Sequence, residues 1–186
     1  TFKMTLLIEY LNKMRGGGQS PPRAPLHEIL WSALGAFISI FSIYYIGHYQ
    51  ALHLIDSLFL VGSFGATGVL VYGIPNSPFS QPRNIIGGHV ISAIVGVSCA
   101  LLLHFHPPLA AATAVALSLI LMHLTQTIHP PGGATALIAV IGSEQIHKMA
   151  YMFVLTPIAS GAVIMLIVAV LINNLSPYRR YPQYWF

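Results

Sequence analysis

The chain has 186 residues, of which 55% are hydrophobic and only 6% are charged. A soluble domain carries about 25% charged residues, so the four acidic and eight Lys/Arg side chains here are too few to cover a globule of this size. The mean hydropathy of +0.73 agrees with that view. The composition therefore excludes an ordinary soluble enzyme or binding domain. It predicts an all-α, polytopic membrane bundle in contact with a lipid bilayer.

The isoelectric point near 9.4 does not indicate nucleic-acid binding. The few basic residues flank apolar segments, where Lys and Arg set the orientation of a membrane protein. We therefore expect no nucleic-acid partner.

Residues 1–24 form a polar lead before the first apolar segment. Its apolar side chains recur at every fourth position, at Phe2, Leu6, Tyr10 and Met14. This spacing is typical of a short helix on the membrane surface, although a poorly ordered tail fits almost as well. The stretch RGGGQSPPRAP at 15–25 predicts a linker.

Six apolar segments follow, at 28–47, 52–73, 85–105, 108–126, 130–142 and 149–173. A membrane-spanning helix needs about 20 residues. The second segment contains GSFGATG at 62–68, which predicts an interruption, and the fifth is short and opens with Pro-Pro-Gly-Gly. If both span, there are six spans; if both are re-entrant, there are four.

The basic residues favour cytoplasmic termini. Lys3, Lys13, Arg15 and Arg23 precede the first segment, and six spans place Arg83 and Arg179–Arg180 on the same side. We expect a multi-pass protein of a bacterial-type inner membrane, with the aromatic and basic tail at 175–186 anchored at the cytoplasmic interface.

The chain also repeats a pattern. FGATGVLVYG at 64–73 resembles GGATALIAVIG at 132–142, which pairs Thr67 with Thr135. Shorter matches precede both stretches. The membrane domain at 25–174 is thus predicted to hold two repeats, at about 25–105 and 106–174. Three spans in each would place them in opposite orientation, and two spans plus a re-entrant segment would leave them parallel.

The stretch HPPGGAT at 129–135 predicts a helix start inside the membrane. Prolines and glycines break helices, and proline suits the first helical positions. A helix that begins there leaves about four N–H groups unpaired, which makes its partly positive end an anion site. SFGAT at 63–67 is interpreted as a weaker counterpart, and paired interrupted segments point to the binding site of a transporter. Close packing through small residues is the alternative.

These motifs resemble the HPP family of integral membrane proteins, which is named for its His-Pro-Pro sequence. The resemblance runs from about Pro25 to Arg180. It is carried by GSFGATGVLVYGIPNSPFSQPRNIIGGHVISAIVG at 62–96 and by HPPGGATALIAVIG at 129–142. Characterised plastid and cyanobacterial members are nitrite transporters, so the resemblance implies transport of nitrite or a similar small anion.

The residues themselves favour an anion over a cation. A cation path would show more carboxylates within apolar segments. His89 and His129 can bind an anion or relay a proton, and Thr67 and Thr135 can donate O–H groups. The predicted substrate-binding residues are Ser63, Phe64, Gly65, Ala66, Thr67, His89, His129, Pro131, Gly132, Gly133, Ala134 and Thr135, with Arg83 and Asn84 at the mouth of the pathway.

Three functions are weighed. The first is transport of a small inorganic anion, without enzymatic activity, cofactor or metal. The second is a non-transporting accessory or scaffold subunit. The third is a haem- or metal-binding redox protein, against which the sequence offers no HExxH, no CxxC and no paired intramembrane carboxylates. Six short segments make a thin bundle, which favours a homo-oligomer.

Overall fold

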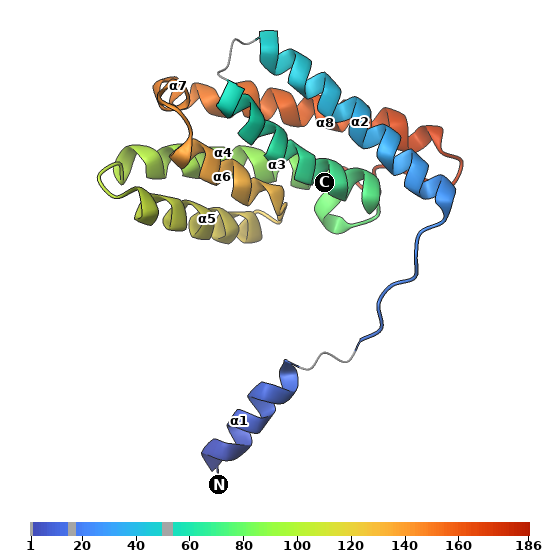
Figure 1. The fold of residues 1–186 in the computed structure, drawn as a ribbon, viewed down its shortest axis with the longest axis horizontal. Coiled ribbons are helices and arrows are strands. Elements are labelled where there is room, and N and C mark those ends of the chain that lie inside the picture. Colours follow the sequence, from blue (N-terminus) through green and yellow to red (C-terminus); the bar gives the residue numbers. More distant parts are fainter. Residues whose placement is uncertain (1, 15–17, 50–53) are drawn as a thin grey trace.

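The computed structural model is an all-helical bundle, which confirms the predicted fold class (Figure 1). It describes residues 2–14, 18–49 and 54–186, and the side chains of 8–14, 18–45, 57 and 60–186. Within those ranges the chain forms no strand.

The elements follow one another as α1 (Phe2–Lys13), α2 (Leu26–Tyr49), α3 (Leu54–Gly73), the short turn η1 (Pro78–Ser80), α4 (Pro82–Leu102), α5 (Pro107–Leu124), α6 (Pro131–Ile141), α7 (Glu144–Met149), the π-helical turn η2 (Val154–Ala159) and α8 (Ser160–Leu175). Helix α1 lies apart from the bundle at the end of an extended linker (Figure 1). The helix predicted in the polar lead is therefore present, and its place on a membrane surface stays a prediction.

Four stretches of the described chain are long and apolar enough to cross a membrane: Leu26–Tyr45, Pro82–Leu102, Pro107–Leu124 and Val154–Leu175. Two shorter apolar helices accompany them, Leu60–Gly73 and Pro131–Ile141. Large apolar side chains point outward from these helices, including Phe37, Ile120 and Leu171. Such a surface fits a lipid environment, in which each helix satisfies its own backbone hydrogen bonds.

The predicted interruption at 62–68 is wrong, because α3 runs without a break through all three of its internal glycines. The predicted helix start at 63–67 is therefore absent as well. Glycine weakens a helix by only about 1 kcal/mol and keeps its N–H donor, so a mid-helix glycine does not by itself end the hydrogen-bond ladder. No described atom lies within 4 Å of a Cβ built on Gly62 or Gly65, and Gly68 meets only Ala36, at 4.0 Å.

The predicted start inside the fifth segment is confirmed. Helix α5 ends at Leu124, residues 125–130 run without helix, and α6 begins at Pro131. Pro131 occupies a first-turn position, where its missing N–H costs nothing. The eleven residues of α6 make it shorter than a full span.

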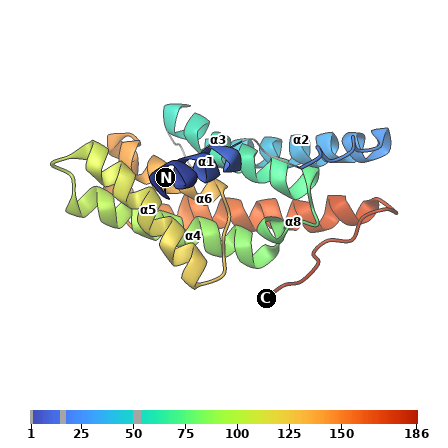
Figure 2. The same ribbon diagram turned by 90° about the horizontal axis from the view of Figure 1, so that it is seen from below.

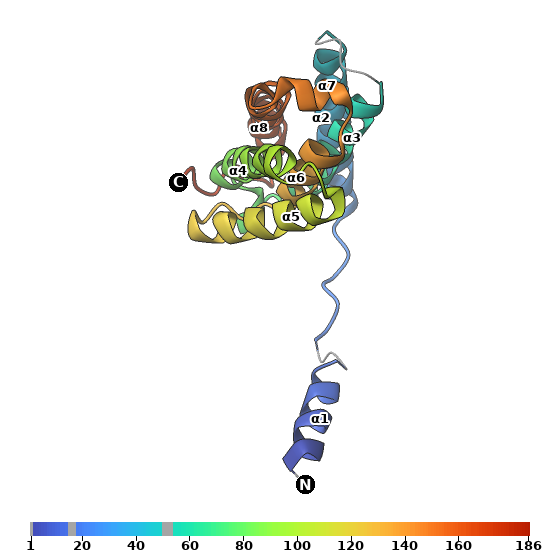
Figure 3. The ribbon, with the colours of Figure 1, turned by 90° about the vertical axis from the view of Figure 1, so that its left-hand side faces the viewer.

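Helices α4 and α6 pack closely at the centre of the bundle, between α5 on one side and α2, α3 and α8 on the other (Figure 3). A Cβ built on Gly132 would lie 2.7 Å from Ser92 Oγ and 2.8 Å from the carbonyl oxygen of Gly88. A Cβ on Gly96 would lie 2.6 Å from the carbonyl oxygen of Ala136. Glycine is thus required at both positions because the two backbones touch there.

The helix pairs in contact fall into matching sets. Contacts of α2 with α3 correspond to those of α5 with α6, and contacts of α4 with α5 and α6 correspond to those of α8 with α2 and α3. This pairing is what two similar three-helix units would give, and the repeat itself stays a prediction.

Candidate functional site

The first turns of α4 hold the non-helical segment that leads into α6. The guanidinium of Arg83 donates to the carbonyl of Thr125 at 2.7 Å, and the amide of Asn84 donates to the carbonyl of Ile128 at 2.8 Å. Gly87 and Gly88 let that segment approach, since a Cβ at either would lie within 2.5 Å of Thr127 or His129. Arg83 and Asn84, which were predicted to line a pathway mouth, therefore position the chain ahead of α6.

Two histidines meet across one threonine hydroxyl. His129 Nε2 lies 2.9 Å from Thr67 Oγ1, and His89 Nε2 lies 2.8 Å from the same oxygen. The imidazole centroids are 4.9 Å apart. The other nitrogen of His129, Nδ1, lies 2.8 Å from the carbonyl oxygen of Phe79 in η1.

The hydrogen bonds continue from His89 into α6. His89 Nδ1 lies 2.8 Å from Thr135 Oγ1, which in turn lies 2.9 Å from Ser63 Oγ. Ser63 also donates to the carbonyl of Pro131 at 3.1 Å. The two threonines that the repeat alignment pairs thus bond the two nitrogens of a single imidazole.

All five side chains of this network are buried, each at 0–1% exposure: Ser63, Thr67, His89, His129 and Thr135. They come from α3, α4, α6 and the segment before α6. We call these five residues the polar chain. All five were among the predicted binding residues, and their binding role stays a prediction.

The carbonyl of Phe79 decides where the protons of the polar chain lie. A carbonyl only accepts, so His129 Nδ1 must carry the hydrogen, and in a neutral ring Nε2 then accepts from the Thr67 hydroxyl. Thr67 has one hydrogen, so it accepts from His89 Nε2–H, and Nδ1 of His89 accepts from Thr135. Every donor then has an acceptor with both rings neutral, and the two rings are opposite tautomers.

The N–H groups at the start of α6 are not unpaired, contrary to the expectation. Pro130 and Pro131 have none, the N–H of Gly132 donates to the carbonyl of His129 at 2.8 Å, and the N–H of Gly133 donates to that of Pro130 at 3.0 Å. The two prolines reduce the number of N–H groups that need a partner, and the tight turn satisfies the N–H groups of the next two residues. A ligand here would have to meet side chains first.

The other predicted binding residues do not supply polar side chains. Phe64 packs its ring on His89, at a centroid distance of 4.9 Å, and covers that imidazole. Gly65 and Ala66 lie on the outer side of α3, whereas Gly132 packs on α4. Gly133 and Ala134 are half-buried, and a Cβ on Gly133 would meet only Val115, at 4.0 Å.

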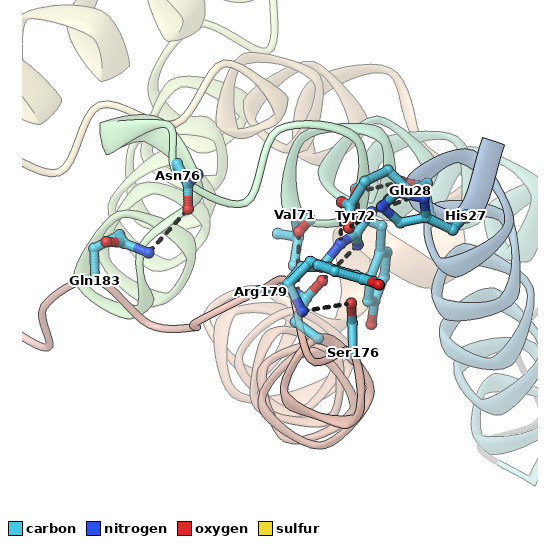
Figure 4. A network of polar contacts seen from close by, with 11 residues as sticks. His27, Glu28, Val71, Tyr72, Asn76, Ser176, Arg179 and Gln183 are labelled. Carbon is cyan, nitrogen blue, oxygen red and sulfur yellow. Dashed lines mark hydrogen bonds and ion pairs between the residues drawn. The ribbon is translucent and has the colours of Figure 1, made fainter. Parts of the chain in front are cut away.

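A second polar cluster, which the sequence reasoning missed, joins the start of α2 to the end of α8 (Figure 4). Arg179 Nε donates to Glu28 Oε2 at 2.6 Å, and its Nη1 donates to the carbonyl of Tyr72 and to Asn173 Oδ1. The Arg179 side chain is 3% exposed. The available signal was Glu28 itself, one of four acids in the chain, placed where a span begins.

The residues after α8 turn back beside η1 and the start of α4 (Figure 2). The phenol of Tyr181 donates to the carbonyl of Ser80 at 2.7 Å, and the backbone N–H of Gln183 donates to Gln81 Oε1 at 2.8 Å. Burial raises the pKa of the Tyr181 phenol well above its ordinary value, and nearby Tyr72 adds to the rise. The tail therefore contacts the outside of the same turn whose Phe79 carbonyl binds His129; its interfacial anchoring stays a prediction.

Among the residues that the structure describes, the histidines outside the polar chain give the redox hypothesis no support. His106 caps α5 by accepting from the N–H of Leu109 at 3.2 Å, and His123 is exposed on α5. The Nε2 atoms of His89 and His129 both face the Thr67 hydroxyl, which occupies the position that a haem iron would need. Over the residues that the structure describes, no three His, Cys, Asp or Glu side chains gather as a metal site.

The spans and the buried polar chain define a multi-pass membrane protein with a polar site enclosed among its helices. The profile described as "HPP, transmembrane region" matches residues 21–182, and the chain belongs to the HPP family. This membership is consistent with membrane transport.

Two transmembrane proteins of Dictyostelium discoideum are each 43% identical to this chain. One alignment covers 96% of the chain and 58% of the relative, and the other covers 100% and 68%. The chain thus spans less than two thirds of the first relative. These relatives are eukaryotic and lend no support to the predicted bacterial inner membrane. No solved structure matches the chain.

Proposed function

We propose that this protein transports a small inorganic anion across the membrane without converting it chemically, and that nitrite is the first substrate to test. One observation carries the proposal: hydroxyl and imidazole groups from three helices converge, fully buried, on one site. None of the side chains bonded in the polar chain is a carboxylate. Such a donor set suits an anion better than a cation.

The position of the site supports this proposal. Helix α6 begins beside the polar chain, and Ser63 donates to the carbonyl of its first residue, Pro131. The partly positive N-terminal end of α6 therefore lies next to hydroxyls that can donate. Half-helices that begin at such sites are common in secondary transporters. The resemblance to nitrite-transporting HPP members points the same way.

In this proposal the hydrogen-bonded arrangement is the closed form of the site. The hydroxyls and imidazoles bond one another, so an entering anion must replace bonds such as that from Thr135 to His89. A transporter that alternates between open and closed forms needs a site that is satisfied when empty, because an unpaired buried polar group costs about 1–3 kcal/mol.

The test is nitrite uptake by purified protein in liposomes, with chloride, nitrate and formate as competitors. Thr135→Val keeps the side-chain shape and removes the hydroxyl between Ser63 and His89. We expect its nitrite uptake to fall about tenfold, the effect of about one buried hydrogen bond. Thr113→Val, at a half-buried position on α5, is the matched control and should transport normally.

Two results would count against the proposal. Wild-type protein that is folded but moves none of these anions would favour an accessory subunit. Equal uptake by Thr135→Val and Thr113→Val would place the substrate away from the polar chain.

A further inference from the structure

We infer that the polar chain carries a proton between His89 and His129 through the Thr67 hydroxyl, so that the anion crosses the membrane together with a proton. This inference rests on the proposed anion transport and names its coupling ion. The observation behind it is the unbroken order of hydrogen bonds from Thr135 through His89, Thr67 and His129 to the carbonyl of Phe79.

The transfer needs no atoms beyond those of the polar chain and an arriving hydronium ion. Thr135 passes its O–H proton to His89 Nδ1 and regains one from hydronium on the α6 side, which makes His89 an imidazolium. The Nε2–H bond of His89 then breaks as its proton moves to Thr67 Oγ1, and the former Thr67 proton bonds to His129 Nε2. His89 ends neutral, the Thr67 hydroxyl is restored, and His129 carries the charge. Both transfers cross hydrogen bonds of 2.8–2.9 Å.

The polar chain has a hydrogen-bond arrangement ready for the charged state. When both nitrogens of His129 carry hydrogen, His129 Nε2–H donates to Thr67 Oγ1, and the proton that Thr67 took from His89 points back to the free His89 Nε2. Every donor then again has an acceptor. The carbonyl oxygen of Ser63, one helical turn earlier, lies 3.3 Å from Thr67 Oγ1 and is a second acceptor to which this hydroxyl can rotate.

The surroundings explain why the proton and the anion should travel together. Each imidazole has the other as its titratable neighbour, while α3 contributes Phe64 and hydroxyls, α6 contributes Thr135, and η1 contributes a carbonyl. Arg83, a charged residue of α4, is turned to Thr125 instead. A buried imidazolium without a counter-charge is costly. An anion in the site supplies that charge, and the imidazolium in turn stabilises the anion.

The exit end of the chain lies near the surface of the bundle. His129 Nδ1–H faces the carbonyl of Phe79, a residue of η1 that is 39% exposed. Water that replaces this carbonyl can take the Nδ1 proton. In this proposal the proton leaves at the turn between α3 and α4.

The experiment measures nitrite uptake and lumen pH together in liposomes held at zero membrane potential, with protein-free liposomes as the baseline. We expect wild-type uptake to acidify the lumen by one proton per nitrite. Thr67→Val should lower proton entry about a hundredfold, the low end of what a positioned proton-transfer group contributes. Thr67→Ser should restore it, and Thr113→Val should match wild type.

The two readouts separate the two proposals. Nitrite uptake without acidification, or unchanged acidification in Thr67→Val, overturns the relay and leaves anion transport standing. No nitrite uptake by wild type overturns the nitrite proposal. The relay is then judged on nitrate, chloride and formate, and it fails if none of the four anions brings a proton in.

A second measurement does not depend on transport or on the stability of a variant. Nitrogen-15 NMR of histidine-labelled wild-type protein reports the tautomer of each ring. We expect His129 to carry hydrogen on Nδ1 and His89 to carry it on Nε2 at neutral pH. Two rings of the same tautomer would break the donor order and overturn the relay.

Discussion

The two glycine-rich segments of the protein, 62–68 in α3 and 129–135 at the start of α6, share the triplet Gly-Ala-Thr but fold differently. Helix α3 continues through its three glycines, whereas the Pro-Pro pair of the second segment marks the start of a short helix. Both segments nevertheless bring a threonine to the same imidazole, that of His89. The comparison shows that the Pro-Pro pair sets where the short helix begins, while the Gly-Ala-Thr triplet brings a hydroxyl to His89 with or without a break.

The glycines of the two segments also differ in purpose. Gly132 allows contact between the backbones of α6 and α4, whereas Gly65 faces space that is open in the described structure. Conformational freedom explains neither of them. One glycine is required by packing, and the other only lowers the stability of its helix.

The largest effect that we expect separates the two neighbouring glycines of α6. Gly132→Ala places a methyl group 2.7–2.8 Å from Ser92 Oγ and the Gly88 carbonyl, and backbone cannot move aside as a flexible side chain can. We expect a loss of about 3 kcal/mol or more, seen as little folded protein on size-exclusion chromatography. Gly133→Ala is the matched control and should fold normally, because its nearest contact is 4.0 Å away. Equal behaviour of the two variants would contradict the close α4–α6 contact.

A smaller effect should distinguish the two threonines. Thr67→Val leaves two buried imidazole nitrogens without a partner, and Thr135→Val leaves one, because Ser63 keeps the carbonyl of Pro131. Each stranded group costs about 1–3 kcal/mol. The apparent Tm in detergent should therefore fall more for Thr67→Val than for Thr135→Val. The reverse order would mean that the hydrogen bonds are shared differently.

The smallest effect concerns the glycine of α3 that touches nothing described. Gly65→Ala should raise the stability of α3 by about 0.5–1 kcal/mol, because alanine loses less backbone entropy in a helix. A slightly higher Tm with normal nitrite uptake is the expected result. A clear loss of uptake would mean that the outer side of α3 meets a ligand or a second subunit.

The sequence was sufficient for the class of protein, because composition alone decides the solvent. It was also sufficient for the start of α6, since proline acts locally. The five residues of the polar chain were among the predicted binding residues, and their role stays a prediction. The sequence failed at 62–68, where glycine permits a break without requiring one. The type of a residue limits the backbone conformations that it can adopt, and packing selects one of them.

Other features were decided only by the tertiary structure. Phe79 lies within the motif at 62–96, but nothing in its side chain indicates that its carbonyl orients the protons of the polar chain from His129 to Thr135. From the sequence, Arg83 is a signal of membrane orientation. Only the tertiary structure shows that its guanidinium binds the carbonyl of Thr125 and holds the segment before α6. Hydrogen bonds between residues about 22 to 72 positions apart in the chain depend on how helices pack. That packing follows from many weak apolar contacts that no single motif records.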